Sequence, residues 1–244
     1  MRGVEWLGVV RHGESTGNVA ARDAETGGLE RIDVAERDAD VPLSETGREQ
    51  AEAVGRWMAG LDPDQRPTAV VVSPYLRARQ TAELALAGHD VPVRVDERLR
   101  DRELGVLDLL TARGVESLLP DEAVRRRRLG KFYYRPPGGE SWVDVIARLR
   151  SLLRDVADDH PDGRVLLFAH DAIVSLVRYV VEGLEEEELM TWARGTVIAN
   201  CSISSWVRGA DGALVPERLN DVRHLERDPH AEPTAQEDVD DRPA

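Results

Sequence analysis

The 244-residue sequence has almost no cysteine, few aromatic residues and no long apolar run. Cys201 is the only cysteine, so neither an internal disulfide nor a metal site built from several cysteines can form. No segment approaches the roughly 20 consecutive apolar residues that a membrane-spanning helix needs. Glu5 precedes a short apolar run at 6–10, which is not the pattern of a signal peptide. We therefore expect a cytoplasmic protein.

Lysine is also scarce, and 46 Asp and Glu residues outnumber 32 Lys and Arg residues, which gives a formal net charge of −14. A body this acidic disfavours nucleic acid or an anionic membrane as the main partner, so an anionic substrate needs a local basic pocket. Lys131 is the only lysine among 32 Lys and Arg residues, so the other basic residues are all arginines. Because arginine is this common in the chain, a single arginine is weak evidence for a binding site. Residues 225–244 hold seven acids against two arginines and are expected to be a disordered tail, which leaves 1–224 as a single domain.

What is present is an alternation of buried strands and amphipathic helices. Apolar or alternating runs predict strands at 5–11, 68–73, 91–95, 164–169, 196–207 and 214–219. Helical spacing predicts helices at 45–60, 76–86, from 141 onward and after 170, with N-terminal capping motifs at Thr46 and Ser141. Residues 13–42 are interpreted as a long polar loop, with a helical turn as one option within it, and about 106–139 as an insertion over the active site. This order predicts an α/β fold, a three-layer sandwich whose mostly parallel central sheet is flanked by helices.

Three of the predicted strands end in residues suited to chemistry. Arg11 and His12 follow the first strand, Ser73-Pro74 with Arg77 follows the second, and His170 ends the strand at 164–169. In a parallel sheet these ends share one edge, so two histidines and two arginines can meet in one pocket.

This set matches what phosphoryl transfer requires. Arginine forks suit the geometry of a phosphate, and a neutral imidazole can attack phosphorus. A helix that starts after His170 can direct backbone N–H groups at an anion. Each residue alone has an ordinary structural interpretation, so the hypothesis depends on their joint placement.

Six motifs in order give the chain a resemblance to the histidine phosphatase superfamily, also called phosphoglycerate-mutase-like. They are Arg11-His12-Gly13-Glu14-Ser15-x-x-Asn18, Pro42-Leu43-Ser44-x-x-Gly47-x-x-Gln50-Ala51, Ser73-Pro74-x-x-Arg77-Ala78-x-x-Thr81-Ala82, Gly139-Glu140-Ser141, Ala169-His170 and Asn200-Cys201-Ser202-Ile203. The similarity runs from about residue 5 to 207. The run at 130–136 before Gly-Glu-Ser is more similar to the broad-specificity phosphatase branch than to glycolytic mutases.

The resemblance implies specific roles. His12 would be the nucleophile that becomes phosphorylated, while Arg11, Arg77 and His170 would bind the transferring phosphoryl group. The residues expected to contact substrate are Ser15, Asn18, Arg102, Glu103, Glu140, Asp171 and Asn200.

The general acid is left open between two carboxyl groups. The family pattern Leu-x-Glu-x-x-x-Gly aligns with residues 99–105, where Asp101 takes the acid position and Glu103 stands two residues on. In an extended segment both side chains point the same way, so either could protonate the leaving group. The alignment with the family pattern favours Asp101 as the general acid. Asp171 replaces the usual glycine after His170, and one hypothesis is that it raises the pKa of His170.

The expected insertion bears on substrate choice. The basic run 125–128 either binds a second anionic group or forms a solvated helix face, which is the usual place for a charge run. Phe132, Tyr133, Tyr134 and Trp142 either form a wall over the leaving group or pack against the core.

The sequence favours a phosphomonoesterase acting on small phosphorylated metabolites, with no metal and no cofactor. A bisphosphoglycerate-dependent phosphoglycerate mutase is the alternative, because both reactions share the first step. A non-catalytic domain that binds a phospho-ligand is the second alternative. We expect a small metabolite as the partner, neither nucleic acid nor membrane, and a homodimer is one assembly to consider.

Overall fold

The computed structural model describes residues 3–236 and is organised around a six-stranded sheet in the order β3-β2-β4-β1-β5-β6. The four strands β3, β2, β4 and β1 are parallel, β5 is antiparallel to β1, and β6 is antiparallel to β5. This is the mostly parallel sheet that the sequence predicted. The strands are β1 (Trp6–Arg11), β2 (Ala69–Val72), β3 (Val93–Val95), β4 (Arg164–Ala169), β5 (Ile203–Arg208) and β6 (Leu214–Asp221).

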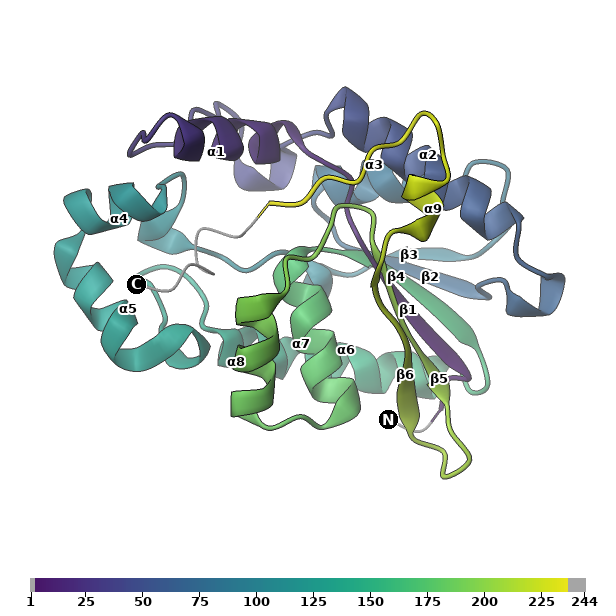
Figure 1. Cartoon of the computed structure of the whole chain (residues 1–244). Coiled ribbons are helices and arrows are strands. Elements are labelled where there is room, and N and C mark those ends of the chain that lie inside the picture. The colour runs from purple at the N-terminus through teal and green to yellow at the C-terminus, as the bar shows by residue number, and fades with distance from the viewer. Residues whose placement is uncertain (1–2, 237–244) are drawn as a thin grey trace.

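Helices cover both faces of the sheet, as Figure 1 shows, so the predicted α/β sandwich is confirmed. Successive side chains of β1 point to opposite faces. Leu7 and Val9 join the core on one face of the sheet, whereas Trp6 and Val10 join the core on the other face. The helices on the two faces are α6 (Trp142–Asp159), α7 (Asp171–Glu182) and α8 (Glu186–Gly195) on one, and α2 (Glu45–Ala59), α3 (Leu76–Ala85) and α9 (Arg223–Glu226) on the other. None of the described helices is long and apolar enough to cross a membrane.

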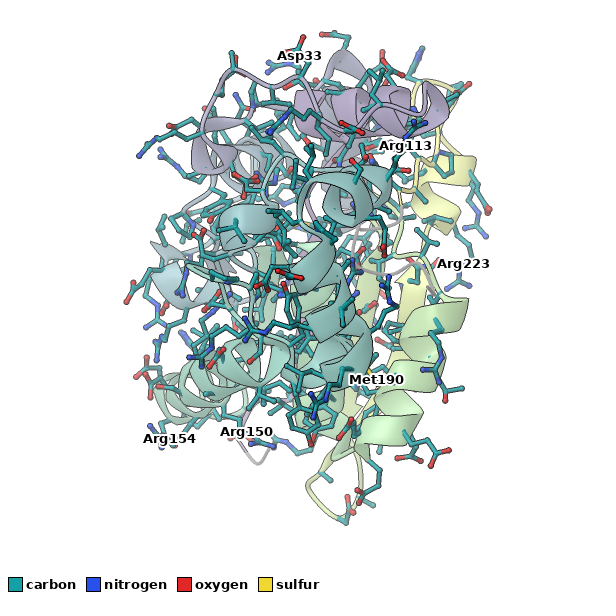
Figure 2. All side chains as sticks on the ribbon, turned by 90° about the vertical axis from the view of Figure 1, so that its left-hand side faces the viewer. Asp33, Arg113, Arg150, Arg154, Met190 and Arg223 are labelled. Atoms are coloured by element: carbon teal, nitrogen blue, oxygen red, sulfur yellow. The ribbon has the colours of Figure 1, made fainter. Side chains whose placement is uncertain are left out.

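Helix α6 follows from its sequence. Ser141 and Asp144 form a capping box that satisfies free N–H groups of its first turn. Leu149, at the middle of its apolar stripe, is fully buried against the sheet. Arg150 and Arg154 lie on the opposite face and project outward at the lower edge of Figure 2. The 3.6-residue period therefore sets which side of α6 meets the core.

The predicted loop at 13–42 is partly wrong, because it contains the helix α1 (Thr16–Thr26). Ser15 and Asn18 close a capping box at its N-terminus. Only Ala21 and Ala24 are buried in this helix. Such small side chains leave no apolar periodicity, so the pattern analysis could not detect the helix.

Several element boundaries also differ from the sequence prediction. Ser44, not Thr46, caps α2, with its Oγ accepting a hydrogen bond from Gly47 N at 3.0 Å. The strand expected at 196–207 begins only at Ile203, and α8 occupies residues that carried no prediction.

The expected insertion folds into two helices, α4 (Ala112–Leu118) and α5 (Pro120–Tyr133). Phe132 and Trp142 belong to the main core beside α6 and α7. Tyr134 is buried in a small cluster with Leu107 and Leu110, and Tyr133 is exposed. None of these four aromatic residues is among the cavity-lining side chains described below, so core packing holds for Phe132, Tyr134 and Trp142, and Tyr133 does neither.

The tail prediction is wrong for residues 225–236. Leu225 is fully buried in the core under α2, and Ala231 is also buried. Ala235 forms an antiparallel bridge with Ala199. Charge count predicted disorder here, but these apolar residues among the acids supply the docking contacts. The remaining part of the predicted tail, 237–244, lies outside the described residues.

Candidate active site

Three parallel strands end side by side and carry the residues that the sequence singled out. β4 lies between β1 and β2, so His12, Ser73 and His170 meet at the carboxyl ends of these strands. The ring centroids of His12 and His170 are 5.2 Å apart, and both side chains are buried. The structure thus brings together the segments that were expected to meet.

His12 is held as a neutral imidazole with a defined tautomer. Its Nδ1 lies 2.7 Å from the Gly13 carbonyl oxygen, which can only accept, so Nδ1 carries the proton. The lone pair is therefore on Nε2. Burial, followed by the positive charges of Arg77, His170 and Arg11, lowers the pKa of His12 well below its usual value. A neutral imidazole is the form that can attack phosphorus.

The loop after β1 is fixed by close backbone packing. A Cβ on Gly13 would lie 2.4 Å from the Gly47 carbonyl oxygen, and a Cβ on Gly47 would lie 1.9 Å from the Glu14 carbonyl oxygen. Gly13 N also donates to Thr81 Oγ1 at 3.0 Å. These contacts explain why glycine is needed at both positions, since any side chain would push the loop away from α2.

His170 is the N-cap residue of α7 and has a polar neighbour at each ring nitrogen. Ser73 Oγ lies 2.8 Å from its Nε2, and Asp101 Oδ2 lies 3.2 Å from its Nδ1. The Tyr75 ring packs edge-on against it, with centroids 5.2 Å apart. Burial lowers the pKa of His170, although Asp101 opposes that shift. The carboxylates that oppose the effect of burial are Asp101 first and then Asp38, while an upward effect of Asp171 on this pKa stays a prediction.

The two arginines line the same cavity and are each held by other groups of the protein. Arg77 Nη1 donates to the carbonyl oxygen and to Oδ1 of Asp38 at 2.6 and 2.8 Å, and Nη2 donates to Asp101 Oδ2 at 2.9 Å. Burial disfavours the charge of Arg77, but Asp38 and Asp101 outweigh it and raise the pKa. Arg11 is 4% exposed, and its Nη1 donates to the Ile198 carbonyl. Its buried Nε has no hydrogen-bond partner among residues 3–236.

The two candidate acids occupy different environments. Burial disfavours the charge of Asp101, but His170 and Arg77 outweigh it and hold its pKa well below the usual range. Glu103 is exposed and accepts a hydrogen bond from Tyr75 Oη at 3.0 Å. Both side chains line the same cavity. Asp101 is thus ionised and placed against His170 and Arg77, while Glu103 stands nearer to solvent.

A cavity of about 170 Å³ opens above His12. Helix α1, the loop that follows it and the segment 101–110 supply most of its wall. The predicted residues in that wall are Arg11, His12, Ser15, Asn18, Arg77, Asp101, Arg102, Glu103 and Asp171.

A family model for the histidine phosphatase superfamily (branch 1) matches residues 7–222. The chain belongs to this superfamily. Among curated relatives, the probable phosphoglycerate mutase GpmB of Salmonella paratyphi C is 30% identical over 228 residues, which cover 89% of this chain and 94% of the relative.

Solved structures of phosphatases are also similar to this chain. A mycobacterial glucosyl-3-phosphoglycerate phosphatase, solved with VO3, has a TM-score of 0.71 at 26% identity and covers 89% of this chain and 100% of its own. The alpha-ribazole phosphatase from Shigella flexneri has a TM-score of 0.70 at 20% identity, covering 88% and 96%, and supports the fold alone. The superfamily and the 26%-identical phosphatase indicate an enzyme of the phosphatase or mutase type.

Three residues expected to contact substrate are not among the cavity-lining residues: His170, which is fully buried beside His12, and Glu140 and Asn200. Glu140 binds Arg100 at 2.6 Å and Arg148 at 3.0 Å. Asn200 Nδ2 donates to the His12 carbonyl oxygen at 3.1 Å. Both Glu140 and Asn200 therefore brace segments that carry cavity residues, and a direct contact of either with substrate stays a prediction. The family motif identified them without saying which way their side chains point.

The basic run 125–128 is also remote from the cavity. Arg125 pairs with Glu122, and Arg127 pairs with Glu116, on the outer surface of α5. None of the four arginines is among the lining residues. The solvated-face interpretation is therefore the one that the structure supports.

Sequence reasoning missed several residues of the cavity wall. Asp38, Glu36 and Asp108 come from irregular segments with no periodic signal, and Gln236 comes from the part of the chain expected to be disordered. Tyr75, which touches His170 and Glu103, followed a motif serine and could have been noticed from that position alone. Among residues 3–236 no group of three or more His, Cys, Asp or Glu side chains is arranged to hold a metal ion.

Proposed function

We propose that this protein is a phosphomonoesterase that hydrolyses small phosphorylated metabolites through a phosphohistidine on His12. The observation that carries the proposal is the state of His12: neutral, protonated at Nδ1, and next to His170, Arg77 and Arg11. A binding module has no need of an imidazole held as a nucleophile. This arrangement therefore favours catalysis over the non-catalytic alternative.

The proposed reaction has two steps. In the first, the Nε2 lone pair of His12 attacks phosphorus, the bond from phosphorus to the leaving oxygen breaks, and that oxygen takes a proton from a carboxyl group. In the second, water attacks the phosphohistidine and gives a proton to the same carboxylate, and His12 is released as a neutral imidazole. Arg11, Arg77 and His170 stabilise the charge on the phosphoryl oxygens in both steps.

Asp101 remains the preferred general acid. It contacts both Arg77 and His170, which places its carboxyl group next to the bound phosphoryl group. Its low pKa in the ligand-free protein reflects those two partners. A bound phosphate dianion draws Arg77 and His170 away from Asp101 and adds negative charge beside it, and both effects raise the pKa of Asp101. Substrate binding itself therefore favours the protonated form of this acid. Glu103 is the alternative acid because it lines the same cavity.

The charge of the cavity wall favours hydrolysis over mutase chemistry. Beyond the phosphate-binding residues the wall carries the acids Glu36, Asp38, Glu103 and Asp108. Burial, followed by the charges of Asp38 and Glu103, raises the pKa of Asp108, so these carboxylates act on one another across the cavity. A mutase must hold a second anionic group on its substrate, and here that group would meet negative charge. We therefore expect a leaving group that is neutral or cationic.

The mutase alternative is supported by one observation, which is the 30% identity to a protein named as a probable phosphoglycerate mutase. Arg102, the remaining basic residue of the wall, would have to bind the second anion. However, its Nε already donates to the Glu140 carbonyl oxygen at 2.7 Å.

The test is turnover of para-nitrophenyl phosphate without added metal, by the wild type, His12→Ala and His89→Ala. His89 is a matched control because it lies in a turn after α3, and it is not among the cavity-lining residues. The proposal predicts activity in the wild type and His89→Ala, and loss in His12→Ala. Activity that survives in His12→Ala would contradict it. A wild type that is inactive here but interconverts phosphoglycerates with bisphosphoglycerate would establish the mutase instead.

A further inference from the structure

The C-terminal segment 231–236 packs against the loop that holds His12. Figure 1 shows this yellow segment running from α9 back across the molecule toward α1. Asn200 N donates to the Thr234 carbonyl oxygen at 2.8 Å, and Ala199 and Ala235 form a β-bridge. The last described residue, Gln236, lines the cavity. The chain therefore ends its described course at the active site.

Thr234 links two buried side-chain amides through one hydroxyl group. Its Oγ1 accepts a hydrogen bond from Gln50 Nε2 at 2.9 Å and donates one to Asn200 Oδ1 at 3.1 Å. Gln50 is 0% exposed and Asn200 is 1% exposed. A buried amide that loses a partner has no water to replace it, so this hydroxyl is not a surface contact of little consequence.

The far ends of both amides hold the backbone around the nucleophile. Gln50 Oε1 accepts from Glu14 N at 2.9 Å, and Asn200 Nδ2 donates to the His12 carbonyl oxygen at 3.1 Å. An amide turned by half a rotation would place oxygen against oxygen at His12, or N–H against N–H at Glu14. The orientation of each amide is thus what makes these backbone contacts favourable.

We propose that Thr234 is a positioning residue for catalysis, which acts on the backbone of His12 and Glu14 through Asn200 and Gln50. Its hydroxyl proton points to Asn200 Oδ1, and its lone pair faces Gln50 Nε2, so one group contacts both amides. The Glu232 carbonyl oxygen is a second acceptor for Gln50 Nε2, at 2.7 Å. Within the segment 231–236 it is the Thr234 side chain that carries this role, whereas the Glu232 side chain is exposed. This role rests on the proposed function, because it concerns the placement of the nucleophile.

The expected effect is on rate more than on substrate binding. Displacing a reacting group by about 1 Å can cost on the order of 100-fold in rate. Arg77 and His170 are anchored by other residues, namely Asp38, Asp101 and Ser73, so the phosphate-binding groups stay in place. Loss of the Thr234 hydroxyl should therefore lower kcat and leave KM nearly unchanged.

The experiment compares Thr234→Val, Thr234→Ser and Glu232→Gln in the full chain. Valine keeps the shape and removes the hydroxyl group, and serine restores the hydroxyl without the methyl group. Glu232→Gln is the matched control because this side chain is exposed and only its backbone carbonyl takes part, accepting from Gln50. We measure kcat and KM for para-nitrophenyl phosphate, the affinity for orthovanadate, and the melting temperature.

In Thr234→Val we expect kcat to fall roughly 10- to 100-fold, with KM within about threefold. Thr234→Ser and Glu232→Gln should stay close to the wild type. A Thr234→Val enzyme with wild-type kcat, or a Thr234→Ser enzyme as slow as Thr234→Val, would overturn the proposal. If the wild type shows no turnover, the proposed function is contradicted, and the role of Thr234 is then tested by the affinity for orthovanadate. That affinity should be at least about tenfold lower in Thr234→Val than in the wild type. An unchanged affinity for orthovanadate rejects the positioning role of Thr234.

Discussion

The contact between Arg77 and Asp38 makes a prediction about phosphate affinity. Arg77 is one of the phosphate-binding groups of the proposed mechanism, yet its Nη1 lies 2.8 Å from Asp38 Oδ1. A phosphate must displace this carboxylate or bind beside its negative charge. Asp38→Asn keeps an oxygen that can accept from Arg77 and removes only the charge, so we expect the variant to bind phosphate more tightly.

The size of the effect follows from the exposure of the pair. Two unit charges 2.8 Å apart interact by about 1.5 kcal/mol in water and about 6 kcal/mol at an effective dielectric constant of 20. The Asp38 side chain is 43% exposed, so the lower value applies and screening reduces it further, to about 1 kcal/mol. This corresponds to a dissociation constant about fivefold lower in Asp38→Asn.

The assay is competitive inhibition of para-nitrophenyl phosphate turnover by inorganic phosphate, supported by calorimetry. Asp40→Asn is the matched control, because Asp40 belongs to the same loop but pairs with Arg37 on the surface, outside the cavity wall. Its inhibition constant should equal that of the wild type. Weaker or unchanged inhibition of Asp38→Asn by phosphate would refute the reasoning about Arg77.

Other variants test the acid, the buried histidines and the C-terminal segment. If Asp101 is the general acid, Asp101→Asn should hydrolyse an alkyl phosphate about 100-fold more slowly or worse, and para-nitrophenyl phosphate with a much smaller loss. Glu103→Gln should hydrolyse both substrates at nearly the wild-type rate. The opposite result for the two variants assigns Glu103 as the general acid. Burial lowers the pKa of His224 to about 4. The unfolded chain therefore takes up a proton first, and this residue removes about 2 kcal/mol of stability between pH 7 and 5, which urea titrations should show and which His224→Gln should abolish. Leu225→Ala should destabilise the protein by about 2–4 kcal/mol in the same titrations, since Leu225 is fully buried, whereas an unchanged midpoint would mean that the segment does not dock.

The sheet and the floor of the site could be predicted because their signals are local. β1 and β4 are apolar runs that stop at a histidine, and parallel strands must end at a common edge. Those two facts place His12 beside His170 without any knowledge of the rest of the chain. The capping box at Ser141 likewise marked the start of α6.

What could not be predicted depends on contacts between distant segments. α1 buries only alanines and so has no apolar stripe, and the segment after Leu225 is dominated by acids although it docks through a few apolar groups. The resemblance identified Glu140 and Asn200 as site residues, but only the fold shows that they brace Arg148 and His12 from behind. The acids of the cavity wall, such as Asp38 and Asp108, come from segments without a regular apolar pattern. Hydrophobic periodicity therefore could not predict that they meet at the cavity.

The central claim is that His12 carries the phosphoryl group during turnover, and rapid quench with mass spectrometry tests it most directly. The enzyme is mixed with para-nitrophenyl phosphate, stopped with alkaline denaturant to preserve phosphohistidine, digested and sequenced. The account predicts one added phosphoryl group on the peptide containing His12 during turnover, and none on that peptide in His12→Ala. A wild type that turns over substrate with no phosphoryl group on His12, or with one on another residue, would contradict it.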